Sequence, residues 1–252
     1  MSTEEKYIYC IVATGNEEKF GPFGIGGRGD ELYTITYQDT GALVSNTPIL
    51  NYKVNRENLL CHERAIEEVM KYHTVLPVRF GTVAEDEKQV KRILEKEYIR
   101  FRQLLDEMGG KKELGLKVVF KEEAIYKDIL TNYNEIRIRK EMIANEPPEK
   151  TYHQRMEIGK MVEVALEKEK KKYRENILHT LMPLCKDVRI NNTYGERMIV
   201  NAAFLVNKHR EAEFDIRVNE LSDKYVDLVK FKYVGTLPPF NFVNLIINVG
   251  EY

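Results

Sequence analysis

The sequence predicts an α+β fold organised as two domains. Apolar runs typical of strands alternate with amphipathic helical segments, and the first half is led by strands whereas the second is led by helices. At 252 residues the chain is long enough for two separate apolar cores. The pattern changes near Phe120, so we place the boundary after residue 121 and assign residues 1–121 and 122–252 to the two domains.

The first half begins with a continuous apolar strand, Tyr7–Val12, which is typical of a strand covered on both faces. A glycine-rich loop, Gly21–Gly29, follows it. The further expected elements are strands at Leu32–Tyr37 and Ala42–Val44, a helix at Asn55–Tyr72 with Asn55 as its N-cap, an extended segment at Val75–Phe80, a helix opened by a capping box at Thr82–Glu85 and closed by Gly109-Gly110, and a strand at Leu114–Phe120. Strands alternating with two helices on one sheet indicate a modified ferredoxin-like α/β sandwich.

The second half begins with helical spacing that continues until Asn145–Pro148 breaks the chain. A second long helix, from about Tyr152 to Leu181, pairs with the first as an antiparallel hairpin. The elements expected after it are strands at Val188–Ile190 and Met198–Val206, a helix at His209–Lys224, a strand with Val229, Phe231 and Tyr233 on one face, and a closing strand within Phe242–Val249. This half is therefore expected to be an α+β domain with a long helical hairpin and a small antiparallel sheet.

The composition excludes several classes of function. Basic and acidic residues number 39 and 40, which argues against binding to nucleic acid or to an anionic membrane. The chain has no apolar run of about 20 residues, and its first residues are polar and acidic, so we expect neither a membrane span nor a secretory signal. The 3 cysteines are far apart without a CxxC pair, which favours a reduced, cytoplasmic location.

No residue pattern indicates catalysis, a metal ion or a cofactor. Gly24–Gly29 matches GxGxxG, but the dinucleotide fingerprint needs a helix at the third glycine, and the following residues indicate a strand. His62 and His73 are too far apart on their helix for a metal pair, which needs a spacing of about four residues. Hydrogen-bonded histidines at the core or its rim are the simpler interpretation. We therefore expect a protein that is not an enzyme.

Arg79 is unusual because it follows Pro77 within an otherwise apolar segment. An unpaired buried guanidinium is costly, so Arg79 should lie on the outer face or pair with a carboxylate. The other interpretation is that it contacts a partner protein.

Four motifs, in order along the chain, resemble the gas vesicle protein F/L family. They are Tyr7-Ile-Tyr9, His62-Glu-Arg64, Leu76-Pro-Val-Arg-Phe-Gly-Thr82 and Gly235-Thr-Leu-Pro-Pro-Phe-Asn-Phe-Val243. The resemblance implies a non-enzymatic accessory or minor structural protein for gas vesicle assembly, with a ferredoxin-like N-terminal domain and an α+β C-terminal domain. It also implies that the protein acts in the cytoplasm at the gas vesicle. The implied partners are the small hydrophobic shell protein, whose shell it would help to nucleate or build, and other gas vesicle accessory proteins.

The two proline-aromatic motifs provide the candidate contact residues. These are Arg79, Phe80, Pro238, Pro239, Phe240 and Phe242. The segment Leu237–Val249 either offers apolar surface and a strand edge to the shell protein, or is a closing strand packed on its own domain. Two other functions stay open: a tandem ferredoxin-like module that binds a small regulatory ligand, and a nucleotide-binding enzyme or transferase supported only by the glycine loop.

Overall fold

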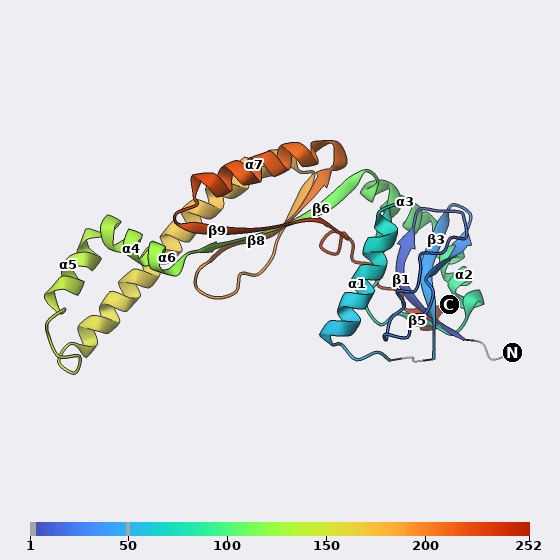
Figure 1. Ribbon diagram of the computed structural model, residues 1–252, viewed down its shortest axis with the longest axis horizontal. Helices are drawn as coiled ribbons and strands as arrows, with labels where there is room; N and C mark the ends of the chain where they lie inside the picture. The colour runs from blue at the N-terminus through green and yellow to red at the C-terminus, as the bar shows by residue number, and fades with distance from the viewer. Residues whose placement is uncertain (1–3, 49–50) are drawn as a thin grey trace. The chain divides into compact units, whose positions relative to one another are not determined.

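The computed structural model describes residues 4–48 and 51–252 (Figure 1). Residues 1–3, part of the polar start considered above, lie outside the described residues. Contacts between Cα atoms divide the chain into two compact units, Met1–Glu113 with Thr236–Tyr252, and Leu114–Gly235. The sequence interpretation differed, because it cut the chain after residue 121 and assigned all later residues to the second domain. In the structure, residues 236–252 belong to the first unit.

The first unit is built on a five-stranded sheet in the order β2-β3-β1-β4, in which β5 also pairs with β1. Its strands are β1 (Glu5–Val12), β2 (Tyr33–Tyr37), β3 (Thr40–Thr47), β4 (Val75–Pro77) and β5 (Val83–Ala84), and its helices are α1 (Arg56–Met70), α2 (Glu87–Lys96) and α3 (Tyr98–Met108). Tyr7 and Tyr9 of β1 belong to the core beneath α1, whereas Ile8 and Ile11 belong to the core beneath α2 and α3. The apolar run of β1 is therefore buried on both faces, as the sequence predicts.

The helix expected to open at Thr82–Glu85 begins later. Val83 and Ala84 form β5, where they pair with β1, and the N-cap of α2 is Asp86. The Asp86 carboxylate accepts a hydrogen bond from Gln89 N at 2.7 Å, and the Gln89 side chain accepts one from Glu85 N at 2.8 Å. The helix is therefore capped by Asp86 and Gln89 in place of the predicted Thr82 and Glu85. The reason is that residues 83–84 form backbone hydrogen bonds with β1 in the sheet. The single helix expected up to Gly109 is two helices that meet at Glu97.

The second unit has the strand and helix order βαββαβ. Its strands are β6 (Lys111–Phe120, with residues from Leu114 in this unit), β7 (Asp187–Ile190), β8 (Met198–Asn207) and β9 (Val229–Leu237), and its helices are α4 (Glu122–Asn132), α5 (Asn134–Met142), α6 (Tyr152–Leu181) and α7 (Glu211–Lys224). Short 3-10 helices lie at Met182–Leu184 and Lys208–Arg210 here, and at Val249–Glu251 in the first unit. The sheet order is β7-β8-β6-β9.

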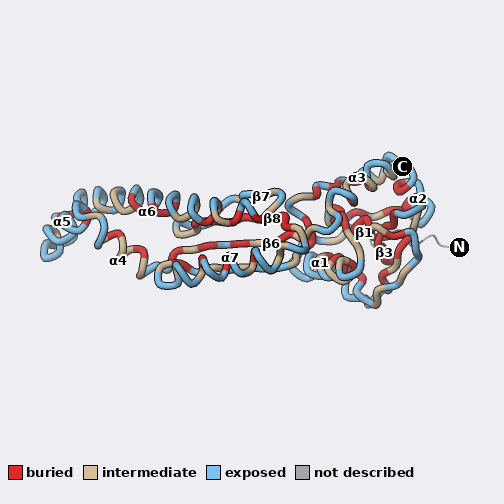
Figure 2. Tube along the Cα trace, turned by 90° about the horizontal axis from the view of Figure 1, so that it is seen from above, coloured by how far each residue is buried: buried red, intermediate tan, exposed pale blue. Residues whose placement is uncertain are grey.

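This order, with the sheet order β7-β8-β6-β9, is that of a ferredoxin-like unit. In the first unit, β1, β2 and β3 all precede the first helix, because the glycine-rich loop connects β1 to β2 without one. The helical hairpin forms, but its first arm, expected as one helix, is two helices, α4 and α5, that meet at Tyr133 and pack against α6. Buried residues concentrate on β1 and β3 in one unit and on β6 and β8 in the other, whereas α5 and the start of α6 are largely exposed (Figure 2).

The closing strand expected within Phe242–Val249 does not form. After β9, residues 238–252 leave the sheet of the second unit, and a single parallel bridge joins Val78 to Leu245. Pro238 and Pro239 have no backbone N–H to continue the ladder, and the Pro238 carbonyl instead accepts from Phe240 N at 2.7 Å. We call residues 238–252 the return segment. Among the described residues, no helix is both long enough and apolar enough to span a membrane.

Candidate functional site

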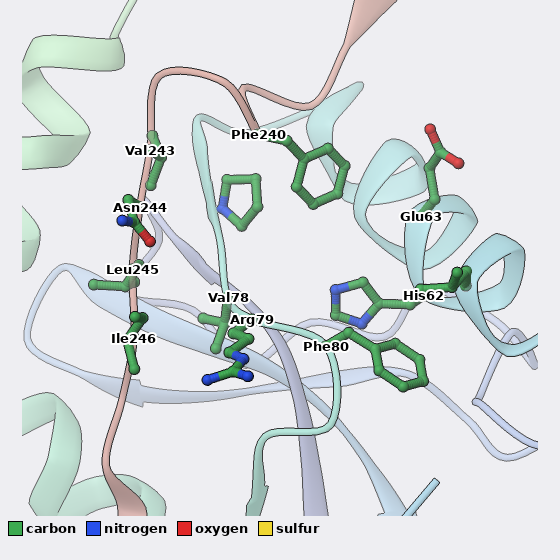
Figure 3. Close-up of a pocket in the computed structure, with 12 residues that line it drawn as sticks. His62, Glu63, Val78, Arg79, Phe80, Phe240, Val243, Asn244, Leu245 and Ile246 are labelled. Atoms are coloured by element: carbon green, nitrogen blue, oxygen red, sulfur yellow. The ribbon is translucent and has the colours of Figure 1, made fainter. Parts of the chain in front are cut away.

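A pocket of about 600 Å³ lies in the first unit between α1, the chain after β4 and the return segment. In Figure 3, His62 and Glu63 lie on the α1 side of the pocket, and Val243, Asn244, Leu245 and Ile246 run along the opposite side. The residues that line it are Leu59, His62, Glu63, Pro77, Val78, Arg79, Phe80, Phe240, Val243, Asn244, Leu245 and Ile246. Most of these side chains are apolar, so the pocket is suited to apolar groups.

The wall from β4 is held by the sheet. Pro77 pairs with Cys10 in β1, and Val78 N donates to Tyr9 O at 3.0 Å. On its other side this strand contacts the return segment, since Arg79 N donates to Leu245 O at 3.3 Å. The return segment therefore occupies part of what would otherwise be an open strand edge.

The wall from the return segment alternates between buried and exposed residues. Val243, Leu245 and Ile247 belong to the core under α2 and α3, whereas Asn244 and Ile246 are exposed. This is the alternation of an extended chain lying on a core. The segment thus serves both as core and as pocket wall.

A buried carboxylate holds the start of this wall. Glu113 is 2% exposed and accepts from Asn241 N at 3.0 Å and from Asn241 Nδ2 at 2.6 Å. Burial raises the pKa of the Glu113 carboxyl, and the hydrogen bonds from Asn241 act in the opposite direction. Sequence reasoning missed this pair because its members are 128 residues apart. The one available signal was an isolated glutamate near the start of the apolar β6 run.

His62 lies at the base of the α1 wall in an aromatic cluster. Its ring stacks on Tyr9 and meets the edge of Phe80, with centroids 5.7 Å apart in each pair. Tyr7 OH accepts from Gly81 N at 3.0 Å and lies 3.0 Å from His62 Nδ1. If the hydroxyl donates its own proton to Nδ1, all three groups are satisfied, and the imidazole proton is on Nε2.

The His62 imidazole is neutral. Burial lowers its pKa to about 4, and an interaction with the Val78 backbone acts weakly in the opposite direction. Nε2 is covered by its neighbours and has no hydrogen-bond partner of normal geometry within the described ranges. His62 is thus a fixed structural group, as the sequence interpretation favoured, and is poorly placed to exchange protons with a ligand.

Charge at the pocket comes from Glu63 on α1 and Arg79 after β4 (Figure 3). Arg79 is exposed, and its guanidinium forms no ion pair with the residues described. It therefore lies on the outer face, and the expected structural pairing with a carboxylate is not observed. Within residues 4–48 and 51–252, no group of three or more His, Cys, Asp or Glu is placed to hold a metal ion. The arrangement can bind an apolar group beside a cation.

The structure brings together part of the candidate contact set. Arg79, Phe80 and Phe240 line this pocket. Pro238 and Pro239 are buried and Phe242 is partly buried, and these three are not among the lining residues. Leu59, His62 and Glu63, from α1, complete the pocket although the sequence interpretation did not propose them as contacts.

The other residues singled out in the sequence have structural roles. The Gly21–Gly29 loop closes on itself, because Gly24 N donates to Asp30 O and Leu32 N to Gly21 O, each at 2.9 Å. No helix begins at Gly29, and the chain enters β2 at Tyr33. His73 Nε2 lies 2.9 Å from Glu18 Oε2, and this hydrogen bond is the main cause of the lowered pKa of Glu18.

Comparison with known proteins identifies the family. The family model described as "Gas vesicle synthesis protein GvpL/GvpF" matches residues 5–244, which include all the strands of both sheets and every pocket-lining residue except Leu245 and Ile246. The chain belongs to this family. Membership supports a role in gas vesicle formation, as the four motifs predict.

Individual relatives are distant in sequence but similar over most of their length. Gas vesicle protein F of Dolichospermum flosaquae is 26% identical, with 77% of this chain and 80% of the relative covered. Gas vesicle protein F of a Streptomyces species is 28% identical, with 94% and 98% covered. Gas vesicle protein F1 of Halobacterium salinarum is 23% identical, with 99% and 97% covered.

Solved structures confirm the α+β fold. The crystal structure of gas vesicle protein GvpF from Anabaena sp. PCC7120 superimposes with a TM-score of 0.80 at 22% identity, covering 96% of this chain and 99% of that one. The structure of GvpF from Microcystis aeruginosa gives a TM-score of 0.75, also at 22% identity.

Proposed function

We propose that this protein is a non-enzymatic accessory or minor structural protein that binds the small hydrophobic shell protein and helps to nucleate or build the gas vesicle shell. In this proposal it acts in the cytoplasm, at the growing vesicle, together with other accessory proteins. The observation that supports it is the apolar pocket where Arg79, Phe80 and Phe240 meet Leu59 of α1.

The pocket has the composition of a protein-binding site. Phe240, Leu59 and Ile246 are 43%, 42% and 47% exposed around it, so a partner would bury apolar surface that now contacts water. Aromatic residues and arginine are the side chains that most often dominate binding energy at interfaces. Phe80, Phe240 and Arg79 provide both kinds within one pocket.

The proposal is tested by introducing a charge into the pocket without disturbing the core. Phe240→Asp and Leu59→Asp change exposed side chains, so the melting temperature should stay within a few degrees of the wild-type value. Each should weaken co-purification with the shell protein by about tenfold or more, since a buried unpaired carboxylate opposes binding. Ile99→Asp is the matched control, because Ile99 is 81% exposed on α3 and does not line the pocket.

Folded Phe240→Asp and Leu59→Asp proteins that bind the shell protein as the wild type does would exclude this pocket as the contact. Cells that carry a variant with weaker binding to the shell protein should also form fewer vesicles, so that the ranking of the variants is the same in both measurements. If binding falls but vesicles form normally, the contact is not needed for shell assembly.

A regulatory small ligand is the second candidate, and the pocket volume favours it. About 600 Å³ lies within the range of roughly 300–1,000 Å³ that small-molecule sites occupy. A ligand that binds only the folded protein must raise the melting temperature, so a screen of amino acids and nucleotides separates the two candidates. Stabilisation that disappears in Phe240→Asp would favour the small ligand.

A further inference from the structure

A second apolar groove lies in the other unit, within the helical hairpin. Its volume is about 340 Å³. The residues that line it are Tyr126, Ile129, Leu130, Ile136, Lys140, Ile143, Arg155, Ile158, Gly159 and Val162. The three helices each contribute one stripe at helical spacing, with residues three, four or seven positions apart.

Two cations are the only charged residues among those that line this groove. Lys140 is on α5 and Arg155 is on α6, so one comes from each arm of the hairpin. Both are exposed. Arg155 Nε donates to Thr151 Oγ1 at 2.9 Å, but neither Lys140 nor Arg155 forms an ion pair with any residue that the structure describes.

The neighbouring arginine, unlike Lys140 and Arg155, is paired with carboxylates. Arg139, adjacent to Lys140, lies 2.9 Å from Glu135 and 3.4 Å from Glu157. Glu135 and Glu157 therefore pair with Arg139, which does not line the groove, whereas Lys140 and Arg155, beside the apolar walls, form no ion pair with a described residue. A ligand that complements it has an apolar body and negative charge at its edge.

The backbone of the groove limits how such a ligand can bind. All lining residues except Ile143 belong to α4, α5 or α6, and away from the helix ends the N–H and C=O groups are bonded within each helix. No strand edge is available there for an added strand. Recognition must use side chains, which is how a groove between helices accepts the apolar face of another helix.

We propose that this groove binds an amphipathic helix of a partner protein, with aliphatic side chains against Ile136, Ile158 and Val162 and with acidic side chains beside Lys140 and Arg155. This interaction surface is separate from the pocket of the first unit and does not depend on its function. A partner with both kinds of contact would be bound at two places on the chain.

Gly159 provides a sharp test because it is an exposed glycine that lines the groove. A Cβ built at Gly159 meets nothing within 4 Å, so the space in front of it is open. Gly159→Leu fills this space with a side chain that favours the helix more than glycine does, so folding is preserved. Gly159→Ala is the matched control, since it improves the helix and adds only a methyl group.

The probe is a labelled helical peptide of about 18 residues, or about five turns, with leucine on one face and glutamate on both flanks. A second peptide carries lysine in place of each glutamate. Fluorescence anisotropy with the full chain should show that the acidic peptide binds about tenfold more tightly than the basic one. The double variant Lys140→Glu, Arg155→Glu should bind the basic peptide more tightly than the acidic one. Gly159→Leu should weaken binding of the acidic peptide by about tenfold or more.

Lys127→Glu is the charge control, because Lys127 is exposed on α4 and does not line the groove. Equal affinity for the two peptides, or full binding by a folded Gly159→Leu protein, would overturn the proposal. Binding to vesicles of phosphatidylglycerol and phosphatidylcholine that Gly159→Leu abolishes, without binding to the acidic peptide, would overturn it in favour of a lipid surface. Phe240→Asp should leave peptide binding unchanged, so this result is independent of the test made on the first unit.

Discussion

Leu245 and Ile246 are adjacent in the return segment, yet their truncation should have very different effects on stability. Leu245 is 2% exposed within the core under α2 and α3, whereas Ile246 is 47% exposed. We therefore compare Leu245→Ala with Ile246→Ala. The pair tests whether residues 238–252 are part of the first unit's core.

The magnitude follows from burial. Leu245→Ala removes three methyl or methylene groups at about 0.8 kcal/mol each, and the cavity that remains adds to this, giving about 3 kcal/mol. Ile246→Ala removes groups already in contact with water and should cost no more than about 0.5 kcal/mol. For a unit of the size of the first one, which lies between the size classes of small and large domains, about 3 kcal/mol lowers the melting temperature by roughly 12 °C.

Differential scanning calorimetry and urea unfolding monitored by circular dichroism measure both variants. Two compact units can unfold in two separate transitions. The transition that shifts should be the one in which the backbone amides of β1 lose their protection from hydrogen exchange. Equal melting temperatures for Leu245→Ala and Ile246→Ala would refute the reasoning. So would a shift confined to the transition of residues 114–235.

Three further predictions concern other parts of the chain. His62 has its pKa lowered to about 4, so the unfolded state binds the proton more readily, and the free energy of unfolding should fall as pH drops from about 6.5 towards 4. In His62→Phe, the part of the dependence of the unfolding free energy on pH that comes from this group should disappear. Urea unfolding at several pH values between about 4 and 6.5 measures it. Gly159→Ala should stabilise the second unit by about 0.5–1 kcal/mol, read by calorimetry, because glycine in a helix interior is unfavourable and the added Cβ has open space. Limited trypsin digestion should cut between α5 and α6, in residues 143–151, or in the Gly21–Gly29 loop before it cuts either sheet.

Each of these has an outcome that would contradict it. A His62→Phe protein with the wild-type pH slope would show that another group causes the acid sensitivity. A destabilised Gly159→Ala protein would show that the position is more tightly packed than the structure indicates. Early peptides from within β1 or β8 would mean that the sheets open before the hairpin connection.

Local signals were sufficient where one segment determines its own structure. Asn55 was identified as an N-cap and accepts from Asn58 N at 2.8 Å, and the helix from Tyr152 to Leu181 has the predicted bounds. The capping box at Thr82 was wrong because Asp86 offers a cap of similar quality, and only the pairing of Val83 with Tyr7 decides between them. Sequence alone does not contain that pairing.

The candidate pocket was only partly predictable for a similar reason. Arg79, Phe80 and Phe240 were found because each follows a proline in an apolar segment, which is visible locally. Their meeting with His62 depends on the return of residues 238–252 to the first unit, and this return depends on contacts such as Glu113 with Asn241. An irregular segment that crosses between units has no periodicity to reveal it.

The division of the chain affects the order in which it can fold during synthesis. The first unit is interrupted by the second, since its residues up to Glu113 and from Thr236 onward are separated by all of Leu114–Gly235. The second unit is continuous, so it can complete its sheet as soon as β9 leaves the ribosome. The first unit, although synthesised first, lacks Val243, Leu245 and Ile247 until the return segment has followed β9, and its core beneath α2 and α3 stays open until that point. A chaperone that recognises nascent chains should therefore be released only after the return segment has emerged.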